Sequence, residues 1–356
     1  MIIGHGGNIH QVAAQLGCAP GDIIDMSSNV NPLGPPPGLL DHLKRQLEGI
    51  NALPEADAAG PIRAFATRHG IGPEQVAAGN GTTQLIYALP SALGFKTAMI
   101  VGPTYADYAD ACALHGTAFR FFLTRVKEGF RADLAAIARQ AEGVDGVFIC
   151  NPNNPTGNLI AGKDLAGLVE ACPGTVFIVD ESYLPFAPDS HRHSLIRHRA
   201  PNLVVLNSMS KIFRVPGLRI GFAVAKPEIR DKIAALVPPW SVNSLAQTAV
   251  SYLMARSAEM DRFVAGTVRF LEGEKQRLCQ ALDPLPKLRA YPSTTSFVLA
   301  ELNGDLDAQR VYDHCLIQKF LIRNCKNFKG LSDRFVRISL KDTDTNTRLA
   351  QTLAEL

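Results

Sequence analysis

Five short apolar runs alternate with longer segments of helical periodicity through the middle of the chain. The runs, rich in valine and isoleucine, span residues 97–102, 146–150, 175–180, 203–207 and 220–225. Continuous apolar runs are typical of strands that are covered on both faces, and parallel strands need helical crossovers to join them. The alternation therefore predicts an α/β fold, in which helices cover both faces of a mostly parallel sheet.

A second region of different organisation follows. Val237-Pro238-Pro239-Trp240 interrupts the periodicity, and a long helical stretch then runs from about residue 244 to 282. Beyond it, strands are expected at 296–301 and 335–340, around a helix that begins near Asp307. This part of the chain predicts a smaller α+β unit.

The length of 356 residues exceeds the usual size of one hydrophobic core. The Pro- and Gly-rich segment from Asn29 to Gly38 is expected to be an extended connector. We therefore expect three parts: an N-terminal segment (1–30) that joins the small domain and the site, a large domain (31–240) and a small C-terminal domain (241–356).

Composition excludes several classes of protein. The hydrophobic fraction of 46% and charged fraction of 19% argue against long disorder. The net charge of +3, with scattered basic residues, gives no reason to expect a nucleic-acid partner. Seven cysteines without a C-x-x-C pair predict neither a disulfide framework nor a metal site. With no export signal and no apolar stretch of about 18 residues, we expect a cytoplasmic protein without a membrane partner.

Lys211 stands directly after an expected strand, in the sequence Ser208-Met209-Ser210-Lys211, and Gly217-Leu218-Arg219 follows. Burial and a nearby cation such as Arg219 would favour a neutral lysine amine, which can form imines. Ser208, Ser210 and Arg219 could bind a phosphate beside it. Read alone, the segment fits a solvated lysine equally well.

Asp180 ends another expected strand, and Tyr183 follows three positions later. A carboxylate at the C-terminal end of a strand points into the crevice where open α/β sheets bind ligands. The alternative for Asp180 is a helix N-cap.

A third strand is followed by the turn Asn151-Pro152-Asn153-Asn154-Pro155-Thr156-Gly157. The prolines and the glycine of this turn would hold Asn154 rigidly as a hydrogen-bond donor.

Gly81, Thr82 and Thr83 precede an apolar helical pattern. Free backbone N–H groups at such a helix N-terminus suit a phosphate, although many helices begin in this way. Tyr105, in Gly102-Pro103-Thr104-Tyr105, follows the run 97–102 and is a candidate aromatic lid or a core residue.

These five motifs, in this order, resemble the fold-type I pyridoxal 5'-phosphate (PLP) enzymes of the aspartate aminotransferase superfamily, particularly the histidinol-phosphate aminotransferase branch. The resemblance covers nearly the whole chain and implies PLP as the cofactor. It implies that Lys211 holds the cofactor as a Schiff base and that Asp180 binds the pyridine nitrogen. It also implies that Asn154 and Tyr183 bind the phenolic oxygen, and that the site lies in a homodimer.

Three further segments resemble the threonine-phosphate decarboxylases of cobalamin biosynthesis. They are His5-Gly6-Gly7-Asn8 with the run from Ile24 to Gly34, Pro239-Trp240-Ser241-Val242-Asn243, and Leu321-Ile322-Arg323-Asn324-Cys325. This resemblance implies that Arg337 binds the substrate carboxylate. It also implies that Arg323, His5 and Asn29 surround the substrate phosphate, with Gly7 and Asn154 beside the substrate.

The implied reaction is loss of carbon dioxide from a small-molecule O-phospho-amino acid. L-threonine O-3-phosphate would give (R)-1-amino-2-propanol phosphate, or L-serine O-phosphate would give ethanolamine phosphate, for the cobamide nucleotide loop. The alternatives are an aminotransferase acting on histidinol phosphate or a similar phosphorylated amine, and a catalytically silent domain that binds PLP or a phosphorylated metabolite.

One position departs from the family pattern. Related enzymes carry a tyrosine before Pro-Asp or Pro-Glu that reaches the cofactor phosphate of the neighbouring subunit, whereas this chain has Leu53-Pro54-Glu55. Leucine cannot donate that hydrogen bond. We therefore expect weaker retention of PLP.

Overall fold

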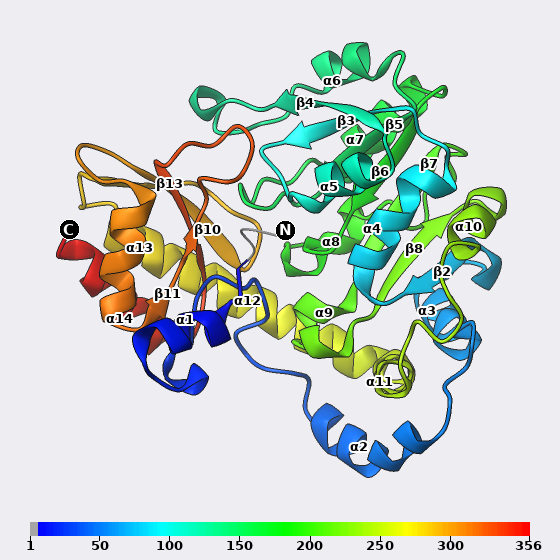
Figure 1. Cartoon of the computed structure of the whole chain (residues 1–356), viewed down its shortest axis with the longest axis horizontal. Helices are drawn as coiled ribbons and strands as arrows, with labels where there is room; N and C mark the ends of the chain where they lie inside the picture. Colours follow the sequence, from blue (N-terminus) through cyan, green and yellow to red (C-terminus); the bar gives the residue numbers. More distant parts are fainter. Residues whose placement is uncertain (1–5) are drawn as a thin grey trace.

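A computed structural model describes residues 6–356, so the expectation for His5 lies outside the described residues. The larger of two main sheets has the strand order β2-β8-β7-β6-β5-β3-β4 (Figure 1). Its strands are β2 (Val76–Gly79), β3 (Thr97–Gly102), β4 (Ala118–Leu123), β5 (Gly146–Cys150), β6 (Val176–Asp180), β7 (Leu203–Ser208) and β8 (Gly221–Ala225). Only β8 runs against its neighbours β2 and β7, so the predicted mostly parallel sheet is confirmed.

The central strands are apolar because helices cover them. Every residue of β5 and β8 is buried, as are the last four residues of β6. The sequence prediction included five of these strands but not β2 or β4. Strand β2 has the sequence VAAG, which is short and has weak strand propensity. Strand β4 lies at an edge of the sheet and is largely exposed, so it lacks the continuous apolar run.

Helices and short 3-10 turns make up the rest of the large part and of the N-terminal segment, to which α1 and η1 belong. The helices before residue 240 are α1 (Ile9–Leu16), α2 (Leu39–Arg45), α3 (Ala59–His69), α4 (Gly81–Ala92), α5 (Asp107–Leu114), α6 (Leu134–Ala141), α7 (Gly162–Ala171), α8 (Ser190–His193), α9 (Met209–Ile212) and α10 (Pro227–Ala234). The 3-10 turns are η1 (Pro20–Asp22), η2 (Leu47–Asn51), η3 (Pro73–Gln75), η4 (Val126–Glu128), η5 (Leu184–Phe186) and η6 (Pro216–Leu218).

The long helical stretch predicted from residue 244 to 282 is two helices, α11 (Ser244–Ala255) and α12 (Ser257–Leu282). Arg256 between them has φ −112° and ψ 44°, outside the helical range. Helix α11 packs against α2 and α3, whereas α12 packs against β9 and α14 of the C-terminal part. The break lets the two segments follow different surfaces, which apolar periodicity alone does not reveal.

The smaller sheet is antiparallel, with the order β12-β13-β10-β9. Its elements are β9 (Leu288–Ala290), β10 (Phe297–Leu302), β12 (Arg323–Asn324) and β13 (Phe335–Ser339), flanked by α13 (Ala308–Ile317) and α14 (Thr343–Ala354). A separate parallel pair joins β1 (Ile24–Asp25) to β11 (Phe320–Leu321). This pair fixes the N-terminal segment beside the smaller sheet, which lies at the left in Figure 1.

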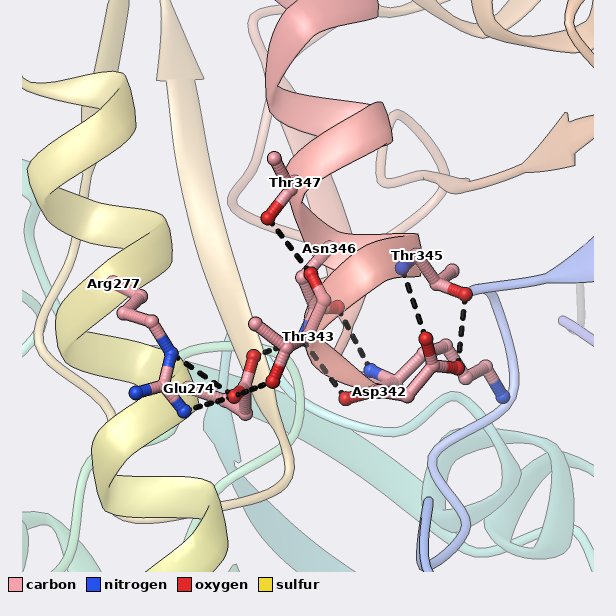
Figure 2. Close-up of polar contacts among 8 residues, drawn as sticks. Glu274, Arg277, Asp342, Thr343, Thr345, Asn346 and Thr347 are labelled. Carbon is pink, nitrogen blue, oxygen red and sulfur yellow. Dashed lines mark hydrogen bonds and ion pairs between the residues drawn. The ribbon is translucent and has the colours of Figure 1, made fainter.

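A buried carboxylate joins α12 to the start of α14 (Figure 2). Glu274 is fully buried, and its oxygens accept hydrogen bonds from Thr343 Oγ1 at 2.7 Å and Asn346 Nδ2 at 2.7 Å. Arg277, one turn along α12, forms an ion pair with the same carboxylate. Because Asn346 also bonds the backbone of Lys341, this network fixes the segment that leaves β13.

No helix within residues 6–356 combines the length and the apolar character needed to span a membrane.

Candidate active site

The predicted site residues converge at the carboxyl edge of the large sheet. Asp180 is the last residue of β6, and Lys211 lies in α9, directly after β7. Asn154 lies in the turn after β5, and Tyr105 follows β3. Parallel strands end at a common edge, so segments far apart in the chain meet there.

Two adjoining cavities open at this edge. The first, here the Asp180 cavity, is lined by Gly81, Thr82, Thr83, Tyr105, Tyr108, Cys150, Asn154, Asp180, Ser182, Tyr183, Ser208, Ser210, Lys211 and Arg219. The second, here the Arg323 cavity, is lined by Gly6, Ser27, Ser28, Asn29, Tyr105, Ala106, Asn154, Tyr183, Lys211, Arg323, Asn327, Phe328 and Arg337. Lys211 lines both cavities, so it lies where they meet.

The structure thus brings together every residue that the sequence assigned to the cofactor. Of the residues assigned to the substrate, Asn29, Asn154, Arg323 and Arg337 line the Arg323 cavity. Gly7 does not line it. Its backbone N–H instead donates to Ser27 Oγ at 2.8 Å, next to the cavity wall formed by Ser27 and Gly6.

Several residues that line the Asp180 cavity are suited to an anion. Gly81 begins α4 with φ +77°. A Cβ atom at this position would lie 2.6 Å from a guanidinium nitrogen of Arg219. The absence of a side chain therefore allows Arg219 to pack against the N-terminus of α4. Ser210 Oγ is buried and has no hydrogen-bond partner among residues 6–356. Free N–H groups of α4, the Arg219 guanidinium and the serine hydroxyls together form a donor set for a phosphate.

Asp180 lines the same cavity. Tyr108 Oη donates to Asp180 Oδ2 at 2.8 Å, and the Ser182 N–H donates to Oδ1 at 2.9 Å. Burial raises the pKa of Asp180, while these donors oppose the rise. A cation placed opposite the carboxylate would lower that pKa again, so the position favours a positively charged ligand group.

Lys211 has the properties of an imine-forming amine. Burial lowers its pKa to about 8, and the positive charges of Arg219 and Arg337 act in the same direction. A substantial neutral fraction is therefore present near neutral pH, as a nucleophilic amine requires.

Tyr183 and Asn29 form a buried pair where the two cavities meet. Asn29 Nδ2 donates to Tyr183 Oη at 3.1 Å, and Ser339 Oγ on β13 donates to Asn29 Oδ1 at 2.6 Å. Burial raises the pKa of Tyr183 to about 12, so the phenol is neutral at physiological pH. Asn29 therefore connects the N-terminal segment, the small sheet and the Tyr183 hydroxyl.

Arg323 and Arg337 are directly opposite each other on β12 and β13. Arg337 is buried and donates to Asn154 Oδ1 and the Ser27 carbonyl oxygen, while its Nε has no hydrogen-bond partner among the described residues. Burial and Arg337 lower the pKa of Arg323 to about 10. Like charges in opposing positions are unfavourable unless an anion compensates them, so the pair indicates an anionic ligand.

The sequence analysis missed several residues of the site. Tyr108, which orients Asp180, lies three residues after Tyr105 in the first turn of α5, and this helical spacing was the only available signal. Asn327 and Phe328 line the Arg323 cavity, but no motif included them. Ser28 also lines it, and the run from Ile24 to Gly34 contained Ser28 without assigning it a role.

The residues present fit PLP. The anion-binding group around Ser210 and Arg219 suits the cofactor phosphate, Lys211 suits its aldehyde, and Asp180 suits a protonated ring nitrogen. This fit rests on three separate features of one cavity.

Comparisons with known proteins agree with the fold. The family model for aminotransferase class I and II matches residues 21–353. The threonine-phosphate decarboxylase of Salmonella typhimurium is 33% identical over 353 residues, covering 98% of this chain and 95% of that protein. The histidinol-phosphate aminotransferase of Methanothermobacter thermautotrophicus is 28% identical, covering 99% and 93%.

A solved structure gives the same picture. The L-threonine-O-3-phosphate decarboxylase from Porphyromonas gingivalis superimposes with a TM-score of 0.82 at 29% identity, covering 93% of this chain and 98% of that chain. With the family model matching nearly the whole length, the chain belongs to the class I and II aminotransferase family, whose cofactor is pyridoxal 5'-phosphate.

Proposed function

We propose that this protein decarboxylates an O-phospho-amino acid. The substrate would be L-threonine O-3-phosphate, giving (R)-1-amino-2-propanol phosphate, or L-serine O-phosphate, giving ethanolamine phosphate, for the nucleotide loop of a cobamide. The observation that carries the proposal is the pair Arg323 and Arg337 in one cavity beside Lys211. A phospho-amino acid offers two anionic groups, and each guanidinium can bind one of them.

The residues of the Asp180 cavity would hold the cofactor. Lys211 would hold it covalently, Asp180 would pair with the ring nitrogen, and Asn154 with Tyr183 would bind the phenolic oxygen. Gly81, Thr82, Thr83, Ser208, Ser210 and Arg219 would bind its phosphate, with Tyr105 against the ring. When bound, the cofactor withdraws electrons from the bond at the substrate α-carbon that is cleaved.

The chain's own contribution would be orientation of the substrate. Arg337 is fixed by Asn154 and Ser27, so its remaining Nε can bind the α-carboxylate. Arg323, with Asn29, would bind the phosphate. Two anchors on adjacent strands would leave the substrate one orientation, and that orientation decides which α-carbon bond breaks. The Lys211 amine, at the junction of the cavities, can then return a proton to the α-carbon.

The rival function is transfer of an amine from histidinol phosphate, because a histidinol-phosphate aminotransferase matches the chain over 99% of its length. Histidinol phosphate has a phosphate but no carboxylate, so it would leave one of the two guanidiniums without an anion.

The test is to incubate the PLP-loaded protein with O-phospho-L-threonine, O-phospho-L-serine or histidinol phosphate. We expect carbon dioxide from at least one of the phospho-amino acids. Amine transfer to 2-oxoglutarate without carbon dioxide would refute the proposal.

The variant Arg323→Gln should lower kcat/KM by about 10- to 100-fold, because hydrogen bonds to charged groups contribute about 1.5–3 kcal/mol. The matched control is Arg310→Gln, an exposed arginine on α13 that should have no effect.

We also propose a homodimer. Three apolar side chains in and after η2 are exposed, those of Leu47, Ile50 and Leu53. Trp240 is half exposed, and its backbone N–H donates to the Ala56 carbonyl close to them in the chain. This group of exposed apolar side chains is typical of a protein interface.

The division of the chain into an N-terminal segment, a large domain and a small C-terminal domain, with boundaries at residues 30 and 240, stays a proposal.

A further inference from the structure

Phe130 occupies an unusual position between β4 and α6. Its backbone has φ +59°, in the left-handed region, yet its side chain is only 3% exposed. A bulky residue rarely adopts this conformation, and it persists only where surrounding contacts favour it. The contacts that the aromatic ring makes are therefore the reason for this backbone geometry.

The ring of Phe130 is buried against the smaller sheet. It meets Tyr291, after β9, at 5.2 Å between ring centroids and Phe335, on β13, at 5.8 Å, both edge-on. Its own loop belongs to the large part, where Asn158 Nδ2 donates to the Gly129 carbonyl at 2.8 Å. Phe130 thus joins the large part to the smaller sheet through aromatic packing.

The same apolar cluster supports one wall of the Arg323 cavity. Cys325 and Phe328 are buried members of the cluster, and Phe328 also lines the cavity. The Arg323 guanidinium carbon lies 5.2 Å from the centre of the Phe328 ring. Arg323 Nη2 also donates to Asn327 Oδ1 at 2.6 Å, next to Phe328. The position of Arg323 therefore depends on the segment 325–328.

We propose that Phe130 is a positioning residue that fixes the end of the substrate cavity formed by Arg323, Asn327 and Phe328. It would do so by packing behind the segment 325–331, which carries no regular secondary structure of its own. The proposal rests on the proposed function in one respect, that Arg323 binds the substrate phosphate. Phe130 does not line either cavity, so its influence passes through Phe328.

The test compares Phe130→Ala and the milder Phe130→Leu with the wild type, all loaded with PLP. Phe119→Ala is the matched control, because Phe119 is a phenylalanine on the neighbouring strand β4 that is 39% exposed. We expect KM for O-phospho-L-threonine to rise about tenfold in Phe130→Ala and less in Phe130→Leu. The kcat value and the visible absorbance of lysine-bound PLP should stay within about twofold. Unchanged KM in both Phe130 variants would overturn the proposal.

Hydrogen exchange provides a readout that does not depend on the reaction. The backbone N–H groups of Cys325, Phe328 and Leu331 donate to carbonyls of Phe335, Cys325 and Phe328. We expect these amides to exchange faster in Phe130→Ala, with β5 to β7 unchanged. Equally fast exchange throughout the protein would show a general loss of stability and overturn the proposal.

The two proposals can fail separately. If the wild type released no carbon dioxide from either phospho-amino acid, the proposed function would fail. Binding of inorganic phosphate, measured by calorimetry, would then still test the role of Phe130, and an equal affinity in wild type and Phe130→Ala would refute it.

Discussion

Lys211 combines burial with two neighbouring cations, and both lower the pKa of its amine, to about 8. Neither influence is visible in the local sequence, where Lys211 reads equally as a solvated side chain. The cations are Arg219, directly after η6, and Arg337 on β13, two segments that are distant from each other in the chain. At the scale of the residue, the tertiary environment therefore decides the chemistry of this lysine.

The first prediction concerns the pH dependence of cofactor capture. Only the neutral amine attacks the aldehyde, so the rate at which apo-protein takes up PLP should rise with pH, with a midpoint at about 8, and level off above that midpoint. Arg219→Gln removes a cation, which raises the pKa of Lys211 and should move the midpoint to higher pH. The appearance of visible absorbance after mixing measures both effects.

Two control proteins complete this experiment. Lys211→Ala should show no such absorbance, and Lys226→Ala, at the exposed start of α10, should behave as wild type. A wild-type midpoint near 10.5, the ordinary value for lysine, would contradict the assignment.

At the scale of elements, the Glu274 network joins α12 to α14 and thereby holds the end of β13, the strand that carries Arg337 (Figure 2). Buried carboxylates are stable only with several donors, and this one has Thr343, Asn346 and Arg277. The network therefore supports the smaller sheet at the end of β13.

The second prediction follows from the ionisation of Glu274. The donors Thr343, Arg277 and Asn346 lower its pKa below the ordinary value of 4.5, although burial opposes them. A carboxylate with a lowered folded-state pKa stabilises the fold above about pH 4.5, and this contribution is lost as pH falls below that value. Glu274→Gln should therefore lower Tm at pH 7, and the difference from wild type should shrink as the pH falls below about 4.5.

Thermal unfolding at a series of pH values measures this effect. The control is Glu355→Gln, which changes an exposed carboxylate near the end of the chain and should leave the pH profile as it is. A difference in Tm that stays constant as the pH falls from 7 to well below 4.5 would refute the role of the ionised carboxylate.

At the scale of the whole molecule, the segment around Leu53 is the feature least explained by a single chain. Leu53 is 75% exposed, yet it stands where related enzymes carry a tyrosine that reaches the neighbouring subunit. Exposure in one subunit is compatible with burial in the proposed dimer.

The third prediction is that Leu53→Tyr slows the release of PLP from the dimer by about tenfold or more. The tyrosine would donate the hydrogen bond to the cofactor phosphate that leucine lacks, and such a bond contributes about 1.5–3 kcal/mol. Dialysis of the loaded protein against cofactor-free buffer, followed by absorbance, measures retention. Leu53→Phe adds the ring without the hydroxyl, and equal retention in the Tyr and Phe variants would contradict the hydrogen-bond explanation.

The sequence by itself determined the class of fold and the identity of the residues around Lys211. Strands β3, β5, β6, β7 and β8 lie within a residue or two of the predicted apolar runs, because burial on both faces requires continuous apolar residues. Motifs at the ends of these strands were sufficient to place Asp180, Asn154 and Lys211 together, because parallel strands share one carboxyl edge.

Only the tertiary structure decided what the other residues contact. Edge strand β4 is interrupted by Arg120 and strand β2 has only four residues, so the sequence pattern did not predict them. Tyr108 beside Asp180, the opposing positions of Arg323 and Arg337, and the cluster that holds Phe130 and Phe328 all join segments that are distant in the chain. Periodicity reports which face of an element is buried, whereas the partner on that face depends on how the elements pack.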